Sequence, residues 1–146
     1  MNIRKYSTAD ENKCIDVFIS NCPKYFKFEE ADDFKKWLRK FSNHYVLEKD
    51  GEIIGYGGFY IVEEKNHAGL AWGMINRNYH KKGYGKKLLE FRIKKIKELK
   101  KKIEIKINTS QHSYGFFLKF GFKVNNIAKD YYGQGLDKYE MNLLCN

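Results

Sequence analysis

Two glycines flank a tyrosine in a lysine-rich stretch of the sequence, at Gly83-Tyr84-Gly85. A long helical pattern begins at this turn, and four lysines surround it: Lys81, Lys82, Lys86 and Lys87. Because glycine has no side chain, the backbone N–H groups at the start of the helix stay accessible. Free N–H groups, the positive end of the helix and the lysines together favour an anion such as a pyrophosphate.

The spacing of these glycines excludes two common phosphate-binding motifs. The P-loop pattern Gly-x-x-x-x-Gly-Lys-Ser/Thr is absent. A dinucleotide-binding fingerprint would need a third glycine where Leu88 stands, and it would follow the first strand instead of lying in mid-chain. The two glycines alone are also consistent with a flexible helix start, so the surrounding elements have to decide between these interpretations.

The formal net charge of +10 over 146 residues narrows the classes of partner. Nucleic acid, an anionic membrane and a polyanionic cofactor all suit a basic protein. The sequence has no helix-turn-helix pair and no aromatic RNP-like strand, so we expect no nucleic-acid partner. It also lacks an apolar signal core and the roughly 20 consecutive apolar residues of a membrane helix, so we expect no membrane association.

Cysteine usage indicates the redox environment. The three cysteines, Cys14, Cys22 and Cys145, form no Cys-x-x-Cys pair and have no histidine at zinc spacing. We therefore expect reduced thiols in a cytoplasmic protein, and no metal site. Abundant lysine, isoleucine and asparagine are typical of an AT-rich bacterial genome.

The elements that must position the basic turn follow from apolar periodicity. Strands are expected over residues 2–6, 44–48, 53–62, 68–76, 102–108, 122–127 and 138–144, and helices over 9–21, 31–41, 84–100 and 111–120. Three glycines within 53–62 predict a bulge or a close backbone approach. The order β-α-α-β-β-β-α-β-α-β-β predicts an α/β fold with a mixed sheet and helices on both faces, in a single domain spanning 1–146.

This succession of strand, basic turn, long helix and isoleucine-rich strand resembles the GNAT superfamily of N-acetyltransferases. The likeness covers nearly the whole chain and is strongest from Ala71 to Phe122, where the segment Phe116-Phe117-Leu118-Lys119-Phe120-Gly121-Phe122 matches the family's helix ending. It implies that the strands at 68–76 and 102–108 form a central parallel pair that splays apart around acetyl-coenzyme A. It also implies direct acetyl transfer, in a ternary complex, to a primary amine of a small molecule or peptide.

The resemblance implies which residues contact the cosubstrate. The run His80-Lys81-Lys82-Gly83-Tyr84-Gly85, continued by Lys86, corresponds to the family's pyrophosphate loop Gln/Arg-x-x-Gly-x-Gly/Ala. His80 replaces the usual Gln or Arg, and a histidine can still donate a hydrogen bond. Met74 and Ile75 would offer backbone groups to the pantetheine arm, and one of their N–H groups would polarise the thioester carbonyl. Phe117 would also contact the cosubstrate.

The acid and the base of the reaction are less clear from the sequence. Phe117 stands where the family often has a tyrosine that protonates the departing thiolate. Tyr114, one helical turn earlier, is the candidate substitute, followed by His112. The base stays unassigned. Its candidates are water-mediated deprotonation and the side chains of Glu63, Glu64 and His67.

The acceptor site in this family is formed by the segment between the first two helices and by the last hairpin. The resemblance assigns Tyr25, Phe28, Glu29 and Tyr132 to it here. Aromatic rings and carboxylates suit a cationic amine. The alternative is a GNAT-like domain that binds coenzyme A without catalysis or uses another acyl group. The sequence leaves the acceptor and a homodimer open.

Overall fold

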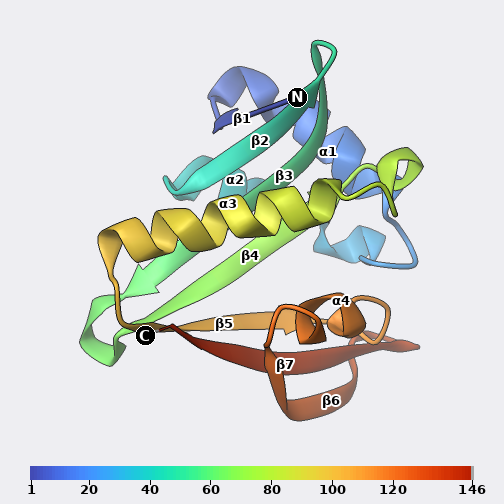
Figure 1. Cartoon of the computed structure of the whole chain (residues 1–146). Coiled ribbons are helices and arrows are strands. Elements are labelled where there is room, and N and C mark those ends of the chain that lie inside the picture. The colour runs from blue at the N-terminus through green and yellow to red at the C-terminus, as the bar shows by residue number, and fades with distance from the viewer. Residues whose placement is uncertain (146) are drawn as a thin grey trace.

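The apolar runs of the sequence form one seven-stranded sheet in the computed structural model, which describes residues 1–145 (Figure 1). The strands are β1 (Asn2–Lys5), β2 (His44–Lys49), β3 (Glu52–Val62), β4 (His67–Ile75), β5 (Ile103–Thr109), β6 (Lys123–Gly133) and β7 (Leu136–Cys145). They lie in the order β1-β2-β3-β4-β5-β7-β6. All neighbours are antiparallel except β4 and β5.

Four α-helices connect these strands. They are α1 (Glu11–Ser20), α2 (Ala31–Lys40), α3 (Tyr84–Leu99) and α4 (Tyr114–Leu118). The predicted order of helices and strands is confirmed, with short 3-10 turns added between them. Among residues 1–145, no helix is long and apolar enough to cross a membrane.

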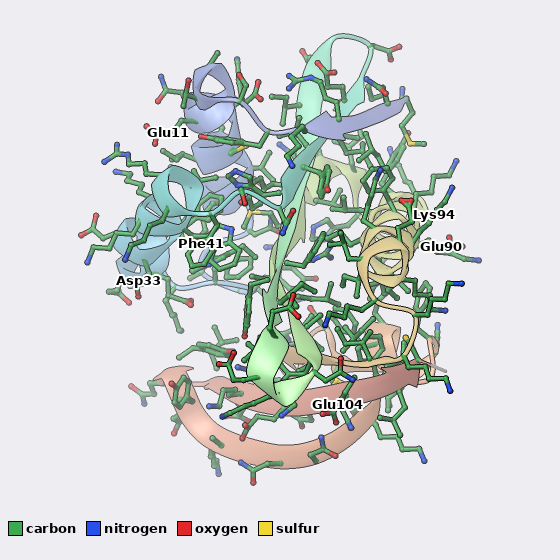
Figure 2. The ribbon with its side chains drawn as sticks, turned by 90° about the vertical axis from the view of Figure 1, so that its left-hand side faces the viewer. Glu11, Asp33, Phe41, Glu90, Lys94 and Glu104 are labelled. Atoms are coloured by element: carbon green, nitrogen blue, oxygen red, sulfur yellow. The ribbon has the colours of Figure 1, made fainter. Side chains whose placement is uncertain are left out.

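The helices cover both faces of the sheet, as the pattern predicted. Figure 2 shows α1 and α2 on one side, marked by Glu11 and Asp33, and α3 on the other, marked by Glu90 and Lys94. Each helix turns its apolar stripe inward and its charges outward because burial of apolar area stabilises the fold.

Two large buried clusters result, one on each face. In the first, Phe18 of α1 and Phe34 of α2 pack with Tyr56 of β3. In the second, Leu89 of α3 packs with Ile105 of β5 and further aromatic side chains. The sheet is therefore anchored from both sides around its central strands.

The parallel pair at the centre of the sheet is joined only over part of its length. Registered partners run from His67 with Glu104 to Leu70 with Ile107, and the pairing then stops. β4 continues to Ile75 without β5, while β5 stays paired with β7 along its whole length. In Figure 1 the two strands separate toward the end where α4 lies. The predicted splayed pair is confirmed.

Several boundaries differ from the sequence prediction. The helix predicted over 111–120 is shorter, Tyr114–Leu118, because the residues before it form a turn in which Ser110 Oγ accepts the His112 N–H (3.2 Å). It also ends earlier than predicted, at Leu118 with Lys119 as the C-cap, and Gly121, at φ 95°, lies in the turn that follows, where the Phe122 N–H bonds the Phe117 carbonyl (3.2 Å). The last two strands are longer than predicted because hairpin pairing continues beyond their apolar residues.

Candidate active site

A bulge interrupts the pairing of β3 and β4 where β4 leaves β5. Here Gly57 lies opposite both Trp72 and Gly73. Trp72 has φ 55°, an uncommon value for a bulky residue, and its ring is held against Phe26 (centroids 5.7 Å apart) and Phe34 (5.2 Å). The bulge predicted from the glycines of β3 is confirmed. A bulge of this kind bends its strand and increases the local twist.

A cavity of about 960 Å³ lies between the diverging parts of β4 and β5. It reaches the start of α3 in one direction and the last hairpin in the other. Its size matches that of small-molecule sites in general. The walls come from residues 70–75 of β4, residues 106–109 of β5, the start of α3, the region of α4, the segment between α1 and α2, and the last hairpin. We call the part near Gly83 the cofactor end and the part near Glu30 the acceptor end.

The cofactor end is built from the turn before α3. Gly83 is the N-cap and has φ 87°, which favours glycine, and a Cβ added to it would meet nothing within 4 Å. Glycine is therefore needed here for its backbone conformation and not to avoid a clash. The Lys87 N–H bonds the Gly83 carbonyl (3.2 Å), so the preceding N–H groups of the first turn have no intrahelical acceptor. These donors are available to an anion.

Most of the residues predicted for the cosubstrate line this cavity: Met74, Ile75, His80, Lys81, Gly83, Gly85, Lys86 and Phe117. Two do not. Lys82 Nζ lies over the ring of Tyr79 (5.6 Å), and the Tyr84 ring packs edge-on to the same residue (6.1 Å). Successive side chains of a tight turn point in different directions, so the turn cannot bring all of its residues to one site.

His80 closes the end of β4. Its Nε2 lies 2.7 Å from the Ile75 carbonyl oxygen, which also accepts a hydrogen bond from Asn21 Nδ2 (2.9 Å). The Ile75 carbonyl oxygen thus already has two side-chain partners. A ligand would have to use other backbone groups of β4. Asn21 is buried and lines the cavity, but sequence reasoning missed it. The only signal was a polar residue at the end of an apolar helix stripe.

The acceptor end carries the carboxylates of the cavity. Glu30, Tyr132 and Glu140 all line it. Glu30 Oε2 accepts the Lys27 N–H (2.9 Å), and burial raises the pKa of this carboxyl above its ordinary value. Burial, reinforced by the nearby charge of Glu30, also raises the pKa of Tyr132. Glu140 Oε2 accepts a hydrogen bond from Asn126 Nδ2 (2.6 Å). This end combines negative charge with aromatic surface.

The predicted acceptor residues are only partly brought together. Tyr25 and Tyr132 line the cavity, whereas Phe28 and Glu29 do not, and the Phe28 side chain is exposed. The three residues Phe28–Glu30 form a 3-10 turn. Its consecutive side chains fan out by about a third of a turn each, so only Glu30 points inward. Both glutamates lie in the segment predicted to form the acceptor site, but Glu29 was selected there, because neighbouring glutamates give no signal of direction.

The structure separates the two candidates for the acid. Tyr114 lies outside the cavity lining, with its ring stacked on Tyr139 (centroids 4.5 Å apart). His112 lines the cavity, and burial lowers its pKa. Its ring meets Tyr25, which lies edge-on to both His80 (5.1 Å) and His112 (5.9 Å). The weaker candidates for the base lie outside the lining: Glu63, Glu64 and His67.

The sequence of this chain is similar to those of known acetyltransferases. The acetyltransferase (GNAT) family matches residues 12–122. A Bacillus subtilis (strain 168) protein, provisionally named a [ribosomal protein bS18]-alanine N-acetyltransferase, is 29% identical over 94 residues, or 63% of this chain and 61% of that protein. The match thus spans about three fifths of that relative's length. An N-alpha-acetyltransferase of Sulfurisphaera tokodaii is 26% identical over 138 residues, or 83% of this chain and 77% of its own.

Solved structures share the fold over its full extent. The Escherichia coli ribosomal-protein-S18-alanine N-acetyltransferase superposes with a TM-score of 0.80 at 17% identity, covering 99% of this chain and 94% of that one. An aminoglycoside 6'-N-acetyltransferase complexed with coenzyme A gives a TM-score of 0.79 at 13% identity, covering 99% and 97%. At these identities the likeness shows the fold, and the acceptors differ between the two structures.

Proposed function

The chain belongs to the acetyltransferase (GNAT) family, and from this premise we propose that it acetylates a primary amine bound at the acceptor end of the cavity. Acetyl-coenzyme A would supply the acetyl group as a thioester. One observation carries the proposal: a single cavity joins a basic, donor-rich helix start to two half-buried carboxylates and several aromatic rings. A polyanionic donor and a cationic acceptor would therefore enter from opposite ends.

The cofactor end fits the phosphates of coenzyme A. The free N–H groups at the start of α3 would hold them, and Lys81 and Lys86 would add positive charge. The part of β4 that is paired with β3 but not with β5, including Met74, would bind the pantetheine arm along its backbone. The cavity leaves room for the arm because β5 has diverged from β4 at this point.

The acceptor end fits an amine. Glu30 and Glu140 would attract the cation, and the Tyr132 ring would add a cation–π surface. Because its pKa is raised, Glu30 is the better matched of the two to accept the proton that the amine must lose. We propose Glu30 as the general base.

Transfer would be direct, within a ternary complex. Among residues 1–145, no cysteine lines the cavity, so no thiol is placed to carry the acetyl group. The region of α4 offers no tyrosine hydroxyl to the departing sulfur, because Phe117 lines the cavity and Tyr114 does not. We therefore propose that coenzyme A is released without protonation by a tyrosine of α4.

Release of free thiol tests this function. The purified protein is incubated with acetyl-coenzyme A and a panel of acceptors: a polyamine, an aminoglycoside and peptides with a free N-terminus. Thiol release that requires one of these acceptors, with initial rates showing intersecting (sequential) kinetics, is expected. Tight binding of coenzyme A without release for any acceptor would instead support a binding domain. Parallel-line kinetics would contradict direct transfer.

A further inference from the structure

A buried arginine in α3 has no acidic partner. The side chain of Arg92 is only 3% exposed, and Nη1 donates to the Gly58 carbonyl (3.2 Å). Within residues 1–145, its Nε has no hydrogen-bond partner and no salt bridge reaches the guanidinium. Arg92 stands four residues after Leu88 and four before Ile96, on the apolar stripe of the helix. The sequence thus contained a charged residue at a core position.

Burial of an unpaired cation is costly, so its presence requires an explanation. Desolvation lowers the pKa of Arg92 to about 10, which still leaves the group charged at neutral pH. Hydrophobic residues of similar size would fill the same volume without this cost. An anion that is present only during function would offset the cost when it binds.

The guanidinium lies against the bulge between β3 and β4. A Cβ added to Gly73 would come within 2.5 Å of Nη2, and one added to Gly57 would come within 2.9 Å of Nε. These two glycines therefore leave the space that Arg92 fills. On the opposite face, a Cβ added to Gly58 would come within 3.1 Å of Trp37 Nε1. Trp37 and Arg92 both line the cavity, so side chains from both faces of the sheet border it, and Arg92 borders it from the side of α3.

The position of Arg92 along α3 gives its depth in the cavity. Gly85, Leu88 and Arg92 line the cavity at helical spacing. Seven residues of helix span about 10 Å, so Arg92 lies that far from the phosphate-binding turn. A long ligand held by its phosphates at the turn would bring its other end toward Arg92 and Gly73, where β4 and β5 converge.

We propose that Arg92 stabilises the negative charge that develops on the coenzyme A sulfur when the acetyl group leaves. This inference rests on the proposed acetyl transfer. The lone pair of the neutral amine forms the new C–N bond, the C–S bond breaks, and its electron pair departs on sulfur. The amine proton passes to Glu30, and the thiolate later takes a proton from water. Arg92 supplies positive charge to the leaving sulfur and does not supply a proton. Phe117, which also lines the cavity, has no hydroxyl that could donate one.

Ionisation of bound coenzyme A measures this effect without turnover. The ultraviolet absorbance of the thiolate is titrated for bound coenzyme A, with bound desulfo-coenzyme A subtracted to remove the signal of the protein's three cysteines. A buried cation beside the sulfur should lower the pKa of the bound thiol by roughly one to three pH units relative to free coenzyme A. In Arg92→Met the value should return toward that of the free thiol, and in Arg92→Lys it should stay lowered.

Lys106→Met is the matched control, because Lys106 is a second basic residue that lines the cavity from β5. It should leave the thiol pKa close to the wild-type value. A bound thiol in the wild-type protein that ionises like free coenzyme A would overturn the inference, and this measurement needs no variant. Equal effects of Arg92→Met and Lys106→Met would overturn it too. Failure of the wild-type protein to bind coenzyme A would instead contradict the proposed function itself.

Discussion

The two ends of the cavity are built in different ways. The cofactor end comes mainly from one run of the chain, from the end of β4 through the turn to α3, and it offers backbone donors and lysines. The acceptor end is assembled from segments far apart in the sequence, with Glu30 before α2, Tyr132 in β6 and Glu140 in β7. It offers side-chain carboxylates and rings.

This difference separates a backbone feature, which tolerates many side chains, from side-chain features, which can be exchanged. Backbone N–H groups at a helix start persist with almost any side chains, provided that the turn keeps its conformation. Side chains on separate loops can be exchanged without disturbing the sheet. We therefore expect cosubstrate binding to depend on the turn conformation, and acceptor choice to depend on a few side chains.

The largest expected effect is at the turn. Gly83→Asp should weaken acetyl-coenzyme A binding at least about 100-fold, because an L side chain strains this left-handed position and the new carboxylate repels the phosphates. Titration calorimetry measures the affinity. Gly51→Asp is the control, since Gly51 has a similar φ of 79° and also nothing within 4 Å of an added Cβ. Equal affinities of the two variants would contradict the assignment of the cofactor end.

The next largest effect is expected at the acceptor end. Glu30→Gln should lower kcat/KM for the amine by about 10- to 100-fold, because it removes the proposed base and one negative charge. The affinity for acetyl-coenzyme A should stay unchanged. Glu29→Gln, the same substitution one residue earlier and outside the cavity lining, should leave both quantities close to wild type. A loss of cosubstrate affinity in Glu30→Gln would show that the two ends are not separate.

The pH dependence should also differ between the ends. Burial raises the pKa of Glu30, so its basic form is lost at a higher pH than for an ordinary glutamate near 4.3. As the pH falls through that raised value, kcat/KM for the amine should fall, and Glu30→Gln should lack this limb of the profile. Acetyl-coenzyme A affinity measured over the same range should not follow it. Identical acidic limbs in wild type and variant would rule out Glu30 as the titrating group.

The smallest effect is expected for a single lysine. Lys86→Met should weaken acetyl-coenzyme A binding about 2- to 5-fold at low salt, since one partly solvated charge near a helix start contributes little. The difference should shrink as salt is added. Lys97→Met, in the last turn of the same helix and outside the cavity lining, is the control. An effect as large as that of Gly83→Asp would mean that side-chain charge, not backbone, dominates this end.

Much of the fold could be predicted from the sequence because its signals are local. The stripe in α3 and the alternation in β5 each report burial within one element, so the element order was predicted correctly. Boundaries were less accurate where pairing overrides composition. β6 runs on through polar residues because β7 provides hydrogen-bond partners for its backbone.

The candidate site was predicted unevenly for the same reason. The spacing of Gly83 and Gly85 predicts a turn from local sequence alone, and both residues line the cavity. Tyr114 was chosen by helical spacing from Phe117, but spacing does not show that its ring stacks on Tyr139. Arg92 was missed because the sequence does not show whether a charged residue in an apolar stripe is buried or has an acidic partner.

A GNAT-like order of elements and a basic helix start suited to an anion could both be predicted from the sequence. Both follow from residues close together in the chain, where periodicity and glycine conformation act directly. The folded structure was needed to show that Glu30, not Glu29, lines the cavity and that Arg92 lies against the bulge without an acidic partner. Those facts depend on the packing of distant segments, because side-chain direction and desolvation are set by residues that are far away in the sequence.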